Sequence, residues 1–182
     1  GNVSPFDLMS SYCVCDGCVD AGNVVKIGLE FESRFWDANT EFFGLAHGTG
    51  DLSSAEFASY WLNFHGVTGR PVLQTYAFGN MADTVESWSD DRLWNAIRDN
   101  LEQLFGKASV SSVSRPAMWR SKWRSDPYSG GAYSYPTVGF KYRQWRDLGK
   151  AVWDGRLQFA GEHTTAEYHS TVHGAFLSGV KA

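Results

Sequence analysis

The chain has 182 residues, of which 43% are hydrophobic and 15% aromatic, which is enough to bury a sizeable core. Its formal net charge of −4 at pH 7 argues against a nucleic-acid-binding surface, because neutralising phosphates needs clustered lysine and arginine. We also expect no membrane span, because no apolar run reaches the roughly 18 residues of a transmembrane helix.

The first 21 residues contain all three cysteines, Cys13, Cys15 and Cys18. A structural zinc site needs four ligands, whereas this run offers three thiols with irregular spacing and no nearby histidine. The segment therefore favours a loop with free thiols, or one local disulfide and a spare thiol. A metal site would need a fourth ligand from elsewhere, and no metal ligands are assigned.

The next segments predict a strand, a helix and a second strand. Residues Val25–Glu32 alternate apolar and polar side chains with period two, which is typical of a strand with one buried face. Residues Asp51–Phe64 are interpreted as a short helix that begins near Ser53 or Ser54, and Pro71–Phe78 as a strand. The glycine-rich stretch before them, Gly44–Asp51, is interpreted as a loop.

The clearest helix lies between Ser89 and Gly106. Ser89 can serve as the N-cap, Asp90 and Asp91 fill the first turn, and Gly106 follows the last apolar position. The apolar residues recur at helical spacing. They are Leu93, Ile97, Leu101, Leu104 and Phe105.

A third strand is predicted at Ala117–Arg124, followed by a turn-rich stretch over Asp126–Pro136. The basic residues from Arg115 to Arg124 are interleaved with Trp119 and Trp123. This pattern favours the solvated face of an amphipathic strand over a phosphate-binding patch.

The last segment, "LQFAGEHTTAEYHSTVHGAFLSG" at Leu157–Gly179, predicts a strand over Leu157–Ala160, a turn at Gly161, and then a helix. Such a turn places backbone N–H groups and the positive end of a helix dipole together, which suits an electron-rich or anionic ligand. The chain starts without methionine, and Ala175–Ala182 has a helical pattern with no cap. We therefore expect a piece of a longer protein, a processed product, or one chain of a split protein.

Four motifs together resemble the C-terminal half of the flavin-containing amine oxidases, in particular polyamine oxidases and lysine-specific histone demethylases. They are "GNVVK" at Gly22–Lys26, "FWD" at Phe35–Asp37, "WRSDPYSGGAYSY" at Trp123–Tyr135 and "FAGEHTTAEYHSTVHGAFLSG" at Phe159–Gly179. Residues 1–21 match nothing in that family.

The resemblance implies an α+β or α/β fold in which a substrate domain, with a mixed sheet and helices, adjoins a glutathione-reductase-like FAD domain. Residues 22–150 would belong to the substrate-binding domain, and 151–182 would form the C-terminal strand–helix segment of the FAD domain. Residues 1–21 would be a cysteine-containing segment of unknown role.

The family chemistry is oxidation of an amine to an imine, with hydride passing to flavin N5 and dioxygen reoxidising the flavin to give hydrogen peroxide. Lys26 matches the family lysine that reaches N5 through a water, and Tyr133 the aromatic that stacks beside the flavin. Both are the implied catalytic residues. The implied substrate-binding residues are Trp123, Tyr128, Tyr133 and Thr171.

The implied FAD contacts come from the last motif. Glu162, after Gly161, matches the residue near the ribityl and pyrophosphate groups, and Thr171 with Val172 matches the backbone contacts at the ring. Thr171 stands where monoamine oxidases and some plant polyamine oxidases have a second tyrosine. The aromatic cage is therefore incomplete, which favours a polyamine or a secondary amine.

The nucleotide half of a FAD site is missing from the sequence, because no GxGxxG motif opens a strand–turn–helix unit. We expect a separate or covalently attached N-terminal FAD-binding half as partner, with a small-molecule amine and dioxygen as substrates. The alternative is a non-catalytic structural or binding subunit derived from an amine oxidase. The matches at Lys26, Tyr133, Glu162 and Thr171 favour the enzyme.

Overall fold

The computed structural model describes residues 19–46 and 56–182. Cys13, Cys15 and Cys18 lie outside these residues, as does most of the glycine-rich stretch that begins at Gly44. The chain divides into two compact units, one made of residues 1–22 and 132–182 and the other of residues 23–131. We call them the ribbon unit and the sheet unit. The predicted boundary after residue 150 falls inside the ribbon unit, and the division into substrate and FAD domains stays a prediction.

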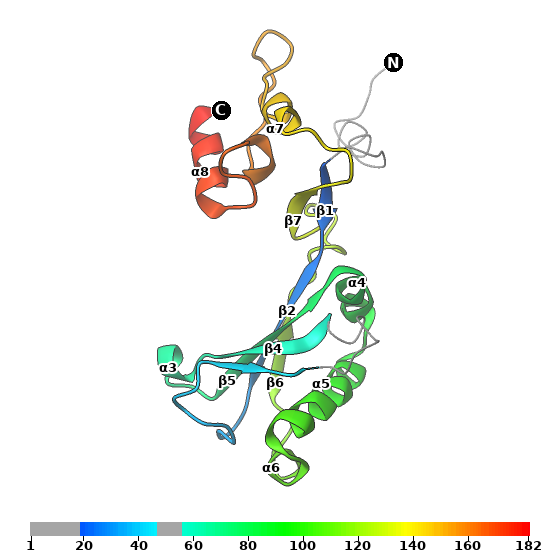
Figure 1. Cartoon of the computed structure of the whole chain (residues 1–182), viewed down its shortest axis with the longest axis vertical. Coiled ribbons are helices and arrows are strands. Elements are labelled where there is room, and N and C mark those ends of the chain that lie inside the picture. The colour runs from blue at the N-terminus through cyan, green and yellow to red at the C-terminus, as the bar shows by residue number, and fades with distance from the viewer. Residues whose placement is uncertain (1–18, 47–55) are drawn as a thin grey trace. The chain divides into compact units, whose positions relative to one another are not determined.

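The sheet unit is built on five strands in the order β3-β4-β5-β2-β6, with helices against one face (Figure 1). All four pairings in this sheet are antiparallel. The strands are β2 (Val24–Glu30), β3 (Phe42–Gly44), β4 (Phe57–Asn63), β5 (Val72–Phe78) and β6 (Ala117–Arg120). Strand β2, predicted from its period of two, pairs with β5, which the sequence also predicts as a strand.

One face of the sheet packs against helices and forms the core. In β2, Val25, Ile27 and Leu29 are fully buried on this face, as the alternation predicts. The helices that follow in the chain are α3 (His65–Thr68), α4 (Gly79–Ser87), α5 (Asp90–Phe105) and α6 (Lys107–Ser111). Buried side chains from α4, α5 and α6 join those of β2, β4 and β5 in one cluster.

Helix α5 forms where the sequence predicts it. The Ser89 hydroxyl accepts a hydrogen bond from the N–H of Arg92 (3.2 Å), and Asp90 and Asp91 lie in the first turn. Leu93, Ile97 and Leu101 are buried. The helix ends before Gly106, which has a φ of 84°, a conformation that glycine adopts with little steric strain.

The predicted helix over Asp51–Phe64 is wrong, because Phe57–Asn63 is strand β4. A β-bulge explains why the apolar residues of this strand have the spacing of a helix. The pairing of β4 with β5 shifts register between Phe57 and Trp61, and Ala58 has a left-handed φ of 52°. Phe57, Ala58 and Trp61 are therefore buried together, with a spacing that resembles one helical face.

Strand β6 ends at Arg120, before the predicted end at Arg124. In the basic segment Arg115 and Arg124 are exposed, as a solvated face predicts, whereas Arg120 is partly buried. Arg120 donates to the carbonyls of Val85 (3.0 Å) and Trp88 (2.6 Å) at the end of α4. Arg115 forms an ion pair with Asp91. These guanidinium groups therefore hold helices to the sheet edge.

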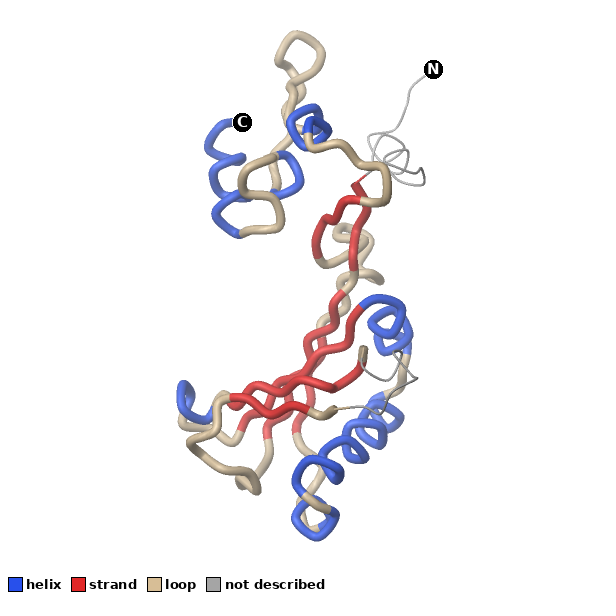
Figure 2. The backbone as a smooth tube through the Cα atoms, viewed as in Figure 1, coloured by secondary structure: helices blue, strands red, loops and turns tan. Residues whose placement is uncertain are grey.

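The ribbon unit contains a two-stranded antiparallel ribbon, short helices and long loops (Figure 2). Its elements are β1 (Val19–Gly22), β7 (Tyr133–Pro136), α7 (Arg143–Leu148), the 3-10 helix η1 (Glu162–Thr164) and α8 (Val172–Lys181). The predicted turn and C-terminal helix are confirmed. The predicted strand over Leu157–Ala160 is wrong, because only Leu157 pairs, in an isolated bridge with Val152.

Across the described ranges 19–46 and 56–182, no helix is long and apolar enough to cross a membrane.

Candidate functional site

Lys26 lies on the face of β2 opposite the core. Its neighbours Val25 and Ile27 are buried, whereas Lys26 is exposed. The backbone is fixed on both sides, because Lys26 pairs with Tyr76 of β5 and exchanges hydrogen bonds with Ser121. Its N–H donates to the Ser121 hydroxyl (2.9 Å), and its carbonyl accepts from the Ser121 N–H (3.0 Å). The sheet therefore holds the backbone of Lys26 in a defined position.

An aromatic row crosses the same open face of the sheet. Adjacent ring centroids lie 5.8 Å apart for Phe42 and Tyr60, 6.1 Å for Tyr60 and Tyr76, and 5.8 Å for Tyr76 and Phe78. Because Tyr76 is the strand partner of Lys26, the lysine stands beside a largely apolar surface. Sequence inspection missed this row, since its members come from three different strands.

Trp123 and Tyr128 lie in the segment that follows β6 in the sheet unit. Trp123 is partly exposed, and Tyr128 is 88% exposed at the tip of an Asx turn in which its N–H donates to Asp126 Oδ1 (2.8 Å). Their predicted place in the amine pocket stays a prediction.

Glu86 anchors the segment that carries Trp123. Its carboxylate accepts from the N–H groups of Arg124 and Ser125 and from the Asn23 side-chain amide, each at 3.0 Å. Burial alone would raise the pKa of Glu86. The three donors outweigh it, so the pKa lies below its ordinary value. Helix α4 therefore fixes this segment through a charged carboxylate.

In the ribbon unit, the Tyr133 ring lies over the backbone of Gly22, its strand partner. A Cβ at Gly22 would come within 2.7 Å of the ring carbon Cζ of Tyr133, so no larger residue fits without moving the ring. The other edge of the ring is open, and Tyr133 is about half exposed. Because Gly22 has no side chain, the ring of Tyr133, a predicted catalytic residue, can lie directly against the backbone of β1.

Glu162 begins η1 directly after Gly161, and its carboxylate faces strand β7. It accepts from the Ser134 N–H (2.9 Å), the Ser134 hydroxyl (2.7 Å) and the Ser170 N–H (2.7 Å). Gly161 has a φ of 148°, and its N–H donates to the Ser178 hydroxyl of α8 (2.8 Å). The two predicted cofactor residues therefore connect β7, η1 and α8.

Thr171 is the N-cap of α8. Its hydroxyl accepts from the Gly174 N–H (3.0 Å) and donates to the Tyr168 carbonyl (2.6 Å). The turn is tight, because a Cβ at Gly174 would lie 2.0 Å from the Tyr168 oxygen. Val172 is 88% exposed at the first helical position. The start of α8 therefore presents its N–H groups and an apolar side chain to the outside.

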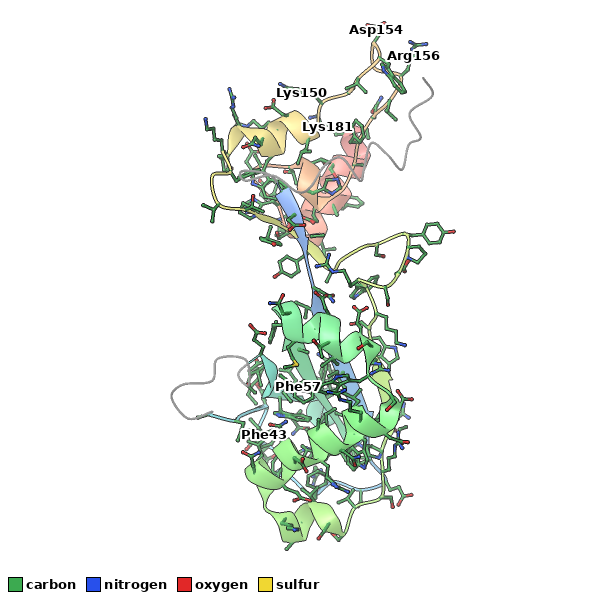
Figure 3. All side chains as sticks on the ribbon, turned by 90° about the vertical axis from the view of Figure 1, so that its right-hand side faces the viewer. Phe43, Phe57, Lys150, Asp154, Arg156 and Lys181 are labelled. Carbon is green, nitrogen blue, oxygen red and sulfur yellow. The ribbon has the colours of Figure 1, made fainter. Side chains whose placement is uncertain are left out.

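A separate hollow of about 720 Å³ lies in the ribbon unit, between α7, η1 and the end of α8. Its lining includes Lys150 and Lys181 (Figure 3). None of the predicted site residues of this unit lines it. Within the described residues, no group of histidine, cysteine, aspartate and glutamate side chains could hold a metal ion.

The structure thus brings Tyr133, Glu162 and Thr171 together in the ribbon unit. Residues 16–182 of the chain match the family described as flavin containing amine oxidoreductase. The chain belongs to this family.

Other family members are similar over most of this chain. A possible lysine-specific histone demethylase 1 of Drosophila melanogaster is 37% identical over 169 residues, which is 88% of this chain and 18% of that protein. A probable polyamine oxidase 4 of Arabidopsis thaliana is 36% identical over 162 residues, or 88% of this chain and 30% of that protein. The chain thus spans less than a third of the length of these two relatives.

The fold also matches solved amine oxidase structures. Wild-type putrescine oxidase bound to putrescine has a TM-score of 0.68 and 21% sequence identity, covering 90% of this chain and 34% of that chain. This likeness confirms the predicted fold class. It adds no information on substrate.

Sequence inspection missed several residues that shape the site of this family member. Gly22 supports Tyr133, Ser134 and Ser170 hold Glu162, and Asn23 holds Glu86. Gly22 and Asn23 lie in the motif "GNVVK", and Ser134 lies in "AYSY". Their position in family motifs could have marked these three residues as part of the site. Glu86 lies outside every motif, on the buried side of α4.

Proposed function

We propose that this chain is the C-terminal part of an FAD-dependent amine oxidase, completed by an N-terminal FAD-binding half. The reaction would oxidise a polyamine or a secondary amine to an imine, with dioxygen as final acceptor and hydrogen peroxide as product. Family membership supports amine oxidation in general, and the substrate, the partner and the peroxide belong to the proposal.

One observation carries the proposal furthest: the predicted aromatic wall and the predicted flavin-facing helix end are joined inside one unit. Ser170 directly precedes the α8 N-cap, and its hydroxyl donates to the carbonyl of Ser134 (3.0 Å). Ser134 directly follows Tyr133 in β7. An amine-binding ring and a helix N-terminus are therefore held close to each other by direct hydrogen bonds.

The residues at the start of α8 suit a flavin. The first N–H groups of a helix have no intrahelical partner, and Val172 and His173 occupy those positions. They carry the positive end of the helix dipole, which stabilises negative charge on an electron-rich ring edge. The exposed Val172 side chain adds an apolar contact. When bound there, FAD would supply the hydride acceptor.

In this proposal Lys26 holds a water molecule near the reacting atoms and helps dioxygen to accept electrons through its positive charge. The hydrogen bonds of β2 fix the backbone of Lys26, and its strand partner Tyr76 belongs to the aromatic row on the same face. Within residues 19–46 and 56–182, no carboxylate pairs with this ammonium group. Tyr133 orients the amine, since an aromatic face attracts a cation by about 0.5–2 kcal/mol.

The preference for a long or secondary amine follows from Thr171. Its hydroxyl is occupied by the N-cap, so only its methyl group can face a substrate. A small side chain here leaves room where a second ring would close the pocket. Trp123 and Tyr128 would line the same cavity as the amine.

The decisive test is the cofactor. The protein that contains this chain together with its N-terminal half should show the absorbance bands of oxidised flavin, whereas the 182-residue chain alone should show none. A colourless complete assembly would refute the enzyme and leave the non-catalytic subunit.

The substrate class is tested by peroxide release from spermine, spermidine, a methyl-lysine peptide and benzylamine. We expect turnover of the polyamines or the methylated lysine, and little with benzylamine. A preference for benzylamine would contradict the substrate class while leaving amine oxidation intact.

A further inference from the structure

Four polar side chains connect helix α4 to the segment that follows β6. They are Asn23, Asp83, Glu86 and Arg124, and we call them the polar clamp. We propose that Glu86, through this clamp, is a positioning residue that fixes Trp123 and Tyr128 relative to Lys26. The inference rests on the proposed function of these three residues in binding and oxidising the amine.

Glu86 lies at the centre of the clamp and is buried, with 7% of its surface exposed. Its Oε1 accepts from the N–H of Arg124 and from the side-chain amide of Asn23, and its Oε2 accepts from the N–H of Ser125, each at 3.0 Å. Hydrogen bonds to a charged acceptor are stronger than those between neutral groups. The backbone at Arg124 and Ser125 is therefore held firmly against α4.

Arg124 closes the loop that carries Tyr128. Its Nε donates to Asp83 Oδ1 of α4 (3.2 Å), and its Nη1 donates to the carbonyl of Gly130 (2.9 Å). The N–H of Gly130 in turn donates to the carbonyl of Asp126 (3.0 Å). A single guanidinium group, held by α4, thus closes this loop.

Trp123 lies between two fixed points of the backbone. On one side, Ser121 exchanges hydrogen bonds with Lys26 of β2. On the other side, the N–H of Arg124 is bonded to Glu86. The position of Trp123 relative to Lys26 therefore depends on both attachments, and loss of the bond to Glu86 would release one end.

Asn23 extends the clamp to the start of β2. It is buried and directly precedes the strand, and its amide donates to Asp83 Oδ1 (2.8 Å) and to Glu86 Oε1 (3.0 Å). This amide bridges two acidic side chains that are neighbours on the helix surface and would otherwise repel each other. The strand of Lys26 and the segment of Trp123 are thus held by the same two acidic residues.

Glu86→Gln cannot keep all three bonds. A glutamine has one acceptor oxygen and a donor NH₂ group, so in either orientation the NH₂ group would face the N–H of Arg124 or that of Ser125. We expect the released segment to take several positions and to bind the amine less tightly. The backbone of Lys26 stays paired in β2, so reoxidation of the flavin by oxygen should not change.

The test uses Glu86→Gln in the complete FAD-loaded assembly, with Glu102→Gln as matched control. Glu102 is a partly buried carboxylate of the same unit, and its ion pair is with Arg98 of its own helix (3.8 Å). We expect Glu86→Gln to raise KM for the amine about tenfold, with kcat changed by less than about threefold. The control should match the wild type.

A double-mutant cycle then shows whether Glu86 acts through the two rings. In a protein that carries Trp123→Ala and Tyr128→Ala, adding Glu86→Gln should no longer raise KM, because the rings that it positions are gone. Hydrogen exchange provides a readout independent of activity: the amides of Arg124 and Ser125 should exchange about tenfold faster in Glu86→Gln. If that variant does not fold, Asp83→Asn weakens a smaller part of the clamp and should raise KM about threefold.

A merely structural role would lower the yield of folded, flavin-loaded protein and leave the KM of that protein unchanged, which would overturn the inference. An equal rise in KM with and without the two rings would overturn it as well. Failure of the proposed function would look different, because the wild-type assembly would then lack flavin or oxidise no amine. The exchange rates of Arg124 and Ser125 would still decide whether Glu86 holds this segment.

Discussion

The sheet unit and the ribbon unit hold their site residues by different means. In the sheet unit, a continuous core of buried side chains from strands and helices fixes β2, and Lys26 stands on the back of that core. In the ribbon unit, Trp145 and Ala166 are the buried hydrophobic residues among those described, and Val172, Phe176 and Val180 of α8 are exposed.

This contrast shows which interactions position the predicted site residues in each unit. Burial of apolar area is the main stabilising contribution in the sheet unit. The ribbon unit depends on directional contacts, such as the carboxylate of Glu162, the hydroxyl of Thr171 and the close approach at Gly174. In the sheet unit we therefore expect the largest losses of stability from substitutions of buried apolar residues. In the ribbon unit we expect them from substitutions that remove a single polar atom or replace a glycine.

The largest effect should come from Trp61→Ala. Trp61 is fully buried in β4, and its indole N–H donates to the Ala58 carbonyl at the bulge (2.7 Å). Removing the ring leaves a cavity and an unpaired carbonyl, so the free energy of unfolding should fall by about 3–5 kcal/mol. Urea unfolding measures the loss. Trp153→Ala is the matched control, because Trp153 is exposed, and a similar loss there would break the comparison.

Lys26→Met should slow the reaction without changing the stability of the sheet unit. Methionine keeps the apolar stem and removes the charge, so folding and flavin content should be unchanged. Loss of one preorganised electrostatic contact costs about 3–4 kcal/mol, or roughly 100- to 1000-fold in rate. Stopped-flow measurements can follow reduction by amine and reoxidation by oxygen separately. Two unchanged half-reactions would make Lys26 an ordinary surface residue of β2.

Gly174→Ala and Gly179→Ala compare two glycines of α8. At Gly174 a Cβ would meet the Tyr168 carbonyl, which is backbone and cannot turn away, so we expect a loss of about 1–3 kcal/mol and disruption of the Thr171 cap. At Gly179 a Cβ meets nothing within 4 Å, and alanine should stabilise the helix by about 0.5–1 kcal/mol. Thermal unfolding distinguishes the two signs. Equal effects would disprove the tight turn.

Glu86→Gln tests whether the charged Glu86 carboxylate stabilises the sheet unit, through the pH dependence of the free energy of unfolding. The folded-state pKa of Glu86 is below its ordinary value of 4.5, so its stabilising contribution is fully present above pH 4.5 and disappears as pH falls through the folded-state pKa. The difference in unfolding free energy between wild type and Glu86→Gln should be about 1–2 kcal/mol at pH 7 and shrink below pH 4.5. A difference independent of pH would contradict the charged anchor.

The predictable parts of the fold are those specified by neighbours in the sequence. Helix α5 has its N-cap, its acidic first turn and its apolar period within one stretch, and β2 shows an uninterrupted period of two. Strand β4 was missed because the bulge at Ala58 places consecutive residues on one face. A strand was wrongly predicted at Leu157–Ala160, because an apolar run forms a strand only where a neighbouring strand pairs with it, and composition cannot show that neighbour.

Family motifs predict Lys26, Tyr133, Glu162 and Thr171 as site residues, and these assignments stay predictions. The motifs do not predict the contacts that support these side chains. Ser134 and Glu162 are 28 residues apart, and their partnership depends on how β7 approaches η1. Gly22 belongs to a family motif, but its contact with the Tyr133 ring depends on the pairing of β1 with β7. Short-range patterns can specify which side chains carry the chemistry. Tertiary contacts decide how each is held.

The turn between Val152 and Leu157 has a consequence for the integrity of the chain. Trp153, Asp154 and Gly155 all have positive φ, and Asp154 and Arg156 project from the tip of the loop (Figure 3). Such tips are preferred sites of proteolytic nicking. Limited trypsin digestion after Arg156 should therefore cut the covalent chain between α7 and α8.

The fragment after such a cut has contacts of its own. It stays bonded through Glu162 to Ser134, through the Ala166 carbonyl to the Tyr142 hydroxyl (2.8 Å), and through stacking of His169 on Trp145 at 4.8 Å. We expect the nicked pieces to co-elute on gel filtration and to separate only in denaturant. The C-terminal segment of this chain would then be an exchangeable part, one that a synthetic peptide spanning residues 157–182 could replace.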